Sequence, residues 1–167
     1  MRILFLFAMI FGSQSGFCQL NFERHSDRNL GIALSYPKNW KPNYKNPNRS
    51  VSFTAMRLEN DRPAASLWIH VSEDKKESLD TLTFNYMKLS QKNGNKISGG
   101  KEANFGGRLY YFFTTSQKNQ EDETRSQFYT TKSGDKFYIV CFMGYRADYY
   151  AKYEPDFLKI IESLKID

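Results

Sequence analysis

The chain has 167 residues, of which 40% are hydrophobic, 16% aromatic and 25% charged, and its formal net charge is +6. This composition excludes an intrinsically disordered chain, and the length suggests one domain with an aromatic-rich core. The Lys and Arg residues are scattered, with no run longer than Lys75-Lys76, so the sequence lacks the basic stripe of a nucleic-acid-binding protein and we expect no nucleic-acid partner.

The N-terminus has the pattern of a signal peptide over residues 1–18. Arg2 precedes the apolar run ILFLFAMIF, which is shorter than the about 20 apolar residues that span a bilayer. We therefore expect an exported protein, periplasmic or extracellular, whose mature chain (19–167) is a single domain without a transmembrane anchor. The stretch SGFC also loosely resembles a lipoprotein box, which would place a lipid anchor at Cys18, although the bulky Phe17 precedes that cysteine.

Strand patterns dominate the first half of the mature chain. After a short polar segment, GIALSYP predicts a strand over about 30–36 that ends at Pro37, because proline lacks the donor for the strand ladder. A loop rich in Pro and Asn is expected over 38–50. Two further strands are predicted over about 51–58 and 65–72.

A helix is expected next, because the period of the apolar residues changes. Leu79, Leu82, Tyr86 and Leu89 are spaced by three, four and three residues, which is one face of an amphipathic helix. Ser78 is a suitable N-cap for this helix.

The remainder predicts four more strands and a second helix. The strands are expected in the glycine-rich stretch 95–107 and over about 108–115, 124–132 and 136–143, with a polar connection at 117–123. RLYYFF and FYIVCF are apolar on both faces, so these strands should lie centrally and be covered on each side. A closing helical stripe is formed by Tyr153, Phe157, Ile160, Ile161 and Leu164. Pro155 either kinks this helix or, as we expect, lies in its first turn, after a separate loop or short helix over 148–153.

Three stretches, GIALSYPKNW, ANFGGRLYYFFTTS and FLKIIESLKI, resemble the PsbP-like family, whose fold is shared with a protein that binds the Ran GTPase. The resemblance covers roughly residues 22–166. It implies an α+β fold, a three-layer α-β-α sandwich with a central, largely antiparallel sheet of about six or seven strands, as the order of elements also does. It also implies binding or assembly, not enzyme activity.

Trp40 follows the first predicted strand and has two interpretations. It either covers an end of the core or forms an aromatic anchor of a partner surface on the 38–50 loop. The other members of that candidate surface are Lys41, Tyr44, Lys45 and Arg49. Trp, Tyr and Arg are the residue types that dominate interface energetics.

Trp68 and His70 are weak pocket candidates, because they share one face of an alternating strand. A single histidine without nearby ligands is poor evidence for zinc, so no metal or other cofactor is expected. Cys141 lies in an apolar strand and is expected to be buried and inert. No catalytic residue is assigned.

The leading hypothesis is a non-enzymatic exported module for binding or assembly in the bacterial cell envelope, with an envelope protein or complex as its partner. The alternative is a carrier or sensor of a small ligand, with a pocket between the sheet and a helix. A hydrolase would need His70 to meet Cys141, a serine or a carboxylate in a cleft.

Overall fold

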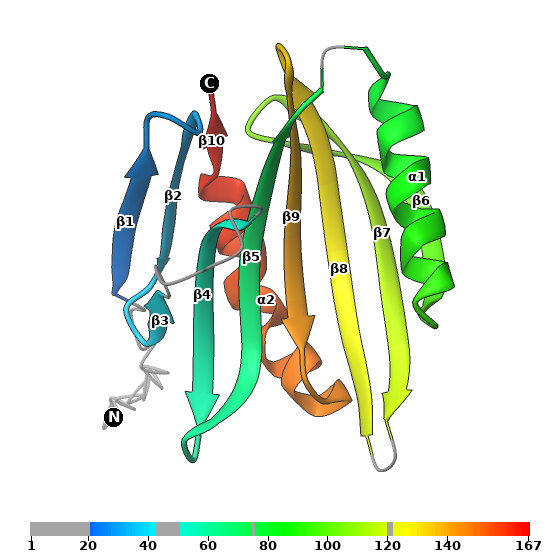
Figure 1. Cartoon of the computed structure of the whole chain (residues 1–167). Helices are drawn as coiled ribbons and strands as arrows, with labels where there is room; N and C mark the ends of the chain where they lie inside the picture. The colour runs from blue at the N-terminus through cyan, green and yellow to red at the C-terminus, as the bar shows by residue number, and fades with distance from the viewer. Residues whose placement is uncertain (1–20, 43–50, 75, 120–121) are drawn as a thin grey trace, which may run out of the picture.

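The computed structural model describes residues 21–42, 51–74, 76–119 and 122–167. Within these ranges the chain forms ten strands and two helices (Figure 1). In chain order they are β1 (Phe22–Asp27), β2 (Ile32–Pro37), β3 (Trp40–Pro42), β4 (Val51–Glu59), β5 (Arg62–Glu73), α1 (Leu79–Lys92), β6 (Lys96–Phe105), β7 (Arg108–Asn119), β8 (Asp122–Ser133), β9 (Lys136–Gly144), α2 (Ala147–Ser163) and β10 (Lys165–Ile166).

Seven strands form one antiparallel sheet in the order β3-β4-β5-β9-β8-β7-β6. The strand β9 is central, as its continuous apolar sequence predicts. Ile139 and Cys141 pack in the cluster that contains the apolar side chains of α1, whereas Val140 and Phe142 pack in the cluster that contains those of α2. Each face of the sheet is thus covered by one helix, and the predicted three-layer α-β-α arrangement is confirmed.

A second sheet of three strands, ordered β1-β2-β10, lies beside α2 (Figure 1). The strand predicted over 30–36 corresponds to β2 and belongs to this small sheet, not to the main one. Its partner β1 was expected to be only a polar segment. All six residues of β1 pair with β2, but most of its side chains are exposed, so its sequence carries little apolar signal.

Helix α1 begins as predicted, with the Ser78 hydroxyl accepting a hydrogen bond from the backbone N–H of Thr81. Three of the four apolar side chains predicted for its inner face are at least partly buried against the sheet, but Leu89 is 54% exposed.

Helix α2 is continuous from Ala147 to Ser163, so the expected break before Pro155 is wrong. Pro155 lies inside the helix, where it removes one backbone hydrogen bond. The predicted apolar stripe is confirmed, since all five of its side chains are buried, and this packing offsets the lost bond. The helix also approaches β9 closely: a Cβ atom at Gly144 would lie 2.5 Å from the backbone N and Cα atoms of Tyr150.

In the part of the chain that the structure describes, neither helix has the length and apolar character needed to cross a membrane.

Candidate functional site

Trp40 is part of the core. It lies on β3, a short strand within the segment expected to be a loop, and pairs with Arg57 of β4. Its side chain is 0% exposed, and its ring centroid lies 6.3 Å from that of Phe142 and 6.2 Å from that of Tyr153. This agrees with the structural role expected for Trp40 and corrects the alternative, in which Trp40 is an anchor of an exposed partner surface.

The other members of that surface are placed only in part. Lys41 is exposed, as expected for the residue next to a buried one on a strand. Tyr44, Lys45 and Arg49 lie outside the described residues. The partner surface therefore stays a prediction for these four residues.

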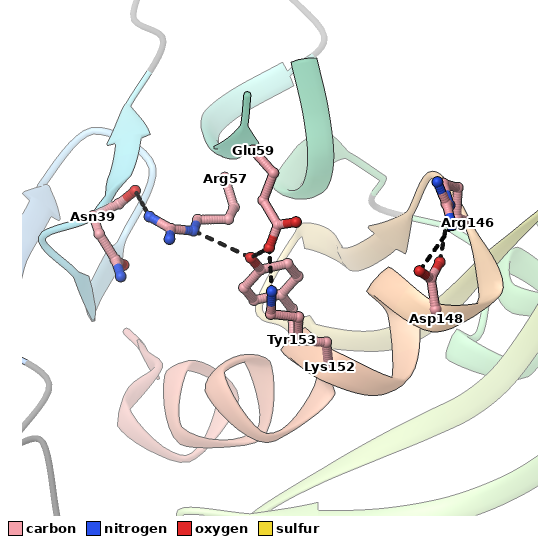
Figure 2. A network of polar contacts seen from close by, with 7 residues as sticks. All are labelled: Asn39, Arg57, Glu59, Arg146, Asp148, Lys152 and Tyr153. Carbon is pink, nitrogen blue, oxygen red and sulfur yellow. Dashed lines mark hydrogen bonds and ion pairs between the residues drawn. The ribbon is translucent and has the colours of Figure 1, made fainter. Parts of the chain in front are cut away.

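A polar network beside Trp40 ties β3 and β4 to α2 (Figure 2). Arg57 donates one hydrogen bond to the Asn39 carbonyl at 3.1 Å and another to the Tyr153 hydroxyl at 3.4 Å. Glu59 accepts hydrogen bonds from Lys152 and from Tyr153, and these lower the pKa of its carboxyl group. Each polar group has a protein partner, so we interpret the network as a structural clamp.

Figure 2 also shows Arg146, which binds Asp148 through two hydrogen bonds of 3.0 Å at the start of α2. Both side chains are at least half exposed, so this pair contributes little stability.

Trp68 and His70 both lie on the α1 side of β5, as the alternation predicts. The ring of Trp68 is half-buried and meets the Phe128 ring edge-on, with 5.8 Å between the centroids. His70 is also half-buried, and burial lowers the pKa of its imidazole. Trp68 lines a cavity of which His70 is not a lining residue.

This cavity, which we call the α1 cavity, has a volume of about 220 Å³ and lies between the end of α1 and the sheet. Its aromatic wall consists of Trp68, Tyr86 and Phe128. The remaining lining side chains are Leu89, Ser90, Asn93, Asn95, Thr115, Gln117, Thr124, Ser126 and Met143. Among the described residues, no charged side chain lines it.

The polar part of this lining was not foreseen. Asn93 is the C-cap of α1, and Asn95 follows two residues later. Gln117 was expected to begin the polar connection at 117–123, and Thr124 to begin the strand after it, whereas the structure places them in β7 and β8. The register that pairs Gln117 with Thr124 aligns β7 with β8, and both residues then meet the end of α1. The sequence carried no local signal for this convergence.

Cys141 and His70 form no catalytic arrangement. Cys141 is 0% exposed, and burial raises the pKa of its thiol well above the ordinary value, so the reactive thiolate is disfavoured. Within the described residues, no group of three or more His, Cys, Asp or Glu side chains could hold a metal ion.

A larger hollow of about 700 Å³ lies between the β6–β7 turn and the C-terminal strand β10. Arg108, a half-buried cation in its lining, donates hydrogen bonds to the backbone carbonyls of Lys132 at 3.2 Å and Ile166 at 2.7 Å. These bonds join the two sheets, so the guanidinium group of Arg108 is already engaged by the protein. This hollow is therefore a weaker candidate for a ligand site than the α1 cavity.

Comparisons with known proteins agree on the fold. Cyanobacterial PsbP (CyanoP) from Synechocystis sp. PCC 6803 is 17% identical, with a TM-score of 0.63 over 94% of this chain and 99% of that one. LpqN of Mycobacterium tuberculosis, involved in cell envelope biogenesis, is 16% identical, with a TM-score of 0.62 over 87% and 90%. The Ran-binding protein Mog1p of Saccharomyces cerevisiae is 8% identical, with a TM-score of 0.61 over 88% and 96%.

A search among curated proteins found no significant match. The sequence model of one family, described as PsbP-like protein, matches residues 11–166, which include every helix and strand described above. The chain therefore belongs to the PsbP-like protein family.

Proposed function

We propose that this protein is a non-enzymatic module for binding or assembly, exported to the bacterial cell envelope, where it acts through a protein partner. The observation that carries the proposal is the fold, which the chain has in common with a Ran-binding protein and with a protein of cell envelope biogenesis. The buried Cys141 thiol and the clamp around Glu59 are consistent with this role, because both groups serve the fold.

Export is supported by the sequence that precedes β1. A short cationic start, an apolar run and small residues are the features of a signal peptide. We infer that the mature domain lies in the periplasm or outside the cell.

The partner surface that we propose contains Lys41, Tyr44, Lys45 and Arg49. Lys41 is exposed on β3, and the clamp on Arg57 and Asn39 holds the start of this strand against α2. A fixed strand that presents a cation loses little conformational freedom on binding. Three cations close to one tyrosine in the sequence favour an acidic partner.

Crosslinking in living cells tests whether the protein has a protein partner and whether the proposed surface binds it. A tagged copy is expressed in its native host, crosslinked and purified, and the captured proteins are identified by mass spectrometry. A surface variant replaces the four proposed residues: Lys41→Ala, Tyr44→Ala, Lys45→Ala and Arg49→Ala. A matched control removes three exposed cations and one exposed ring from α1 and β6: Phe84→Ala, Lys88→Ala, Lys92→Ala and Lys96→Ala.

We expect one dominant envelope protein, captured by the wild type and the control and lost from the surface variant, with the melting temperatures of all three alike. Equal loss from both variants would place the partner elsewhere on the molecule. The absence of any captured protein partner would overturn the binding proposal.

A second candidate function, a small-ligand carrier or sensor, is favoured by one observation. The α1 cavity lies between the sheet and a covering helix, which is where that function needs a pocket.

A further inference from the structure

We propose that the α1 cavity binds a small uncharged ring that carries several hydroxyl groups, namely a single hexopyranose sugar unit. This inference goes beyond the binding of a protein partner and does not depend on it.

The cavity arises from a mismatch in length between helix and strands. Helix α1 has 14 residues and is therefore about 21 Å long. Strands β7 and β8 have 12 residues each and extend about 40 Å. The hairpin of β7 and β8 consequently continues past the C-terminal end of α1 (Figure 1). The cavity lies at this step, where the helix no longer covers the sheet.

One wall of the cavity is aromatic. The ring centroid of Phe128 lies 5.8 Å from that of Trp68 and 5.6 Å from that of Tyr86, so the three rings form a continuous surface. All three remain in the lining of the hollow. Such rings offer a large apolar area with polar edges, which suits the C–H face of a sugar ring.

Most of the remaining lining is polar and only partly used by the protein. Asn95 donates a hydrogen bond to the Ser90 carbonyl at 3.2 Å. The exposed amides of Asn93 and Gln117 make no side-chain hydrogen bond to another described residue. Ser126, which is only 4% exposed, also lines the cavity. Two amides and a hydroxyl thus belong to the lining of the same small space.

The charge and size of the cavity limit what it can bind. No described side chain in the lining is ionised, so a charged ligand would lose its hydration without gaining a counter-charge. The volume of about 220 Å³ is below the about 300–1,000 Å³ of pockets for drug-sized ligands. A single ring with polar substituents therefore fits the site, and neutral amides and hydroxyls can both donate to and accept from its hydroxyl groups.

Tryptophan fluorescence provides the test, because the chain has two tryptophans and only Trp68 lines the cavity, while Trp40 is 0% exposed in the core. The folded mature chain is titrated with glucose, galactose, mannose and N-acetylglucosamine. Glucuronate serves as the charged comparator and cyclohexanol as the ring with a single hydroxyl. We expect a saturable change in emission with at least one neutral sugar, and at least fivefold weaker binding of both comparators.

Two double variants then locate the site. Asn93→Ala with Gln117→Ala removes two exposed amides from the lining and is expected to weaken sugar binding at least fivefold without lowering the melting temperature. Gln91→Ala with Asn104→Ala removes two exposed amides elsewhere and should leave binding unchanged. The proposal is overturned by no saturable response to any of the four sugars, by equal binding of either comparator, or by equal affinities of the two variants. Capture of a protein partner by crosslinking is unaffected by any of these results.

Discussion

Replacement of Trp40 by alanine separates the two roles that its position allows. The side chain is 0% exposed and lies between Phe142 of β9 and Tyr153 of α2. Truncation of a fully buried tryptophan costs about 3–5 kcal/mol, because transfer energy is lost and a cavity remains. For a domain of this size, about 1 kcal/mol shifts the melting temperature by roughly 2–4 °C, so we expect Trp40→Ala to melt roughly 6–20 °C lower.

Thermal unfolding of the mature chain measures this effect, and Lys41→Ala is the matched control. Lys41 is the next residue on the same strand but is exposed, so its substitution should change stability by less than about 0.5 kcal/mol. The indole Nε1 of Trp40 has no hydrogen-bond partner among the described residues, so Trp40→Phe should cost much less than Trp40→Ala. A Trp40→Ala chain that melts like the wild type would refute the core assignment and return this residue to the partner surface.

Three further predictions concern other parts of the fold. Gly144→Ala places a Cβ atom 2.5 Å from the backbone of Tyr150, so it should lower the free energy of unfolding in urea by about 1–3 kcal/mol, and an unchanged urea midpoint would contradict this contact. Burial lowers the pKa of His25 and of His70, so below about pH 6.5 the unfolded chain binds more protons than the folded one. The free energy of unfolding should therefore be smaller at pH 5.5 than at pH 7.5, and His70→Gln should reduce this difference; equal values in the wild type would refute the reasoning. The buried Cys141 thiol should react with an aromatic disulfide reagent at least 100-fold more slowly in the native protein than in urea, and rapid native reaction would show that β9 is accessible.

The central layers of the fold could be predicted because burial leaves a pattern in the sequence. FYIVCF is apolar at every position, and in the structure alternate residues of β9 face α1 and α2. The stripe on α2 repeats every three or four residues and is buried throughout. Both patterns arise from the geometry of one element, so they can be read without knowledge of its neighbours.

Peripheral elements could not be predicted in this way. β1 keeps most of its side chains in solvent and is specified by backbone pairing with β2, which any residue except proline can provide. β3 has only three residues, and the polar, proline-containing sequence around it is typical of a loop. Pro155 was read as a helix start because local rules disfavour it elsewhere, but packing of α2 on the sheet outweighs that preference.

The residues of the candidate site also fall into those that a local sequence pattern predicts and those that it does not. Alternation along β5 places Trp68 on the correct face, and this residue lines the α1 cavity. Asn93, Gln117 and Ser126 come from separate elements and meet only through the sheet register and the length of α1. For Trp40 the sequence pattern allows two roles, because a tryptophan after a strand suits a core and an interface equally well. Only the packing decides between them.

The most direct test of the proposed function is native mass spectrometry of the tagged chain, gently purified from the envelope fraction of its native host. The account predicts a complex of defined stoichiometry between this domain and one other envelope protein. A domain that is recovered alone, or that is found in the cytoplasm with its signal segment attached, would contradict the assignment of this chain as an exported binding module.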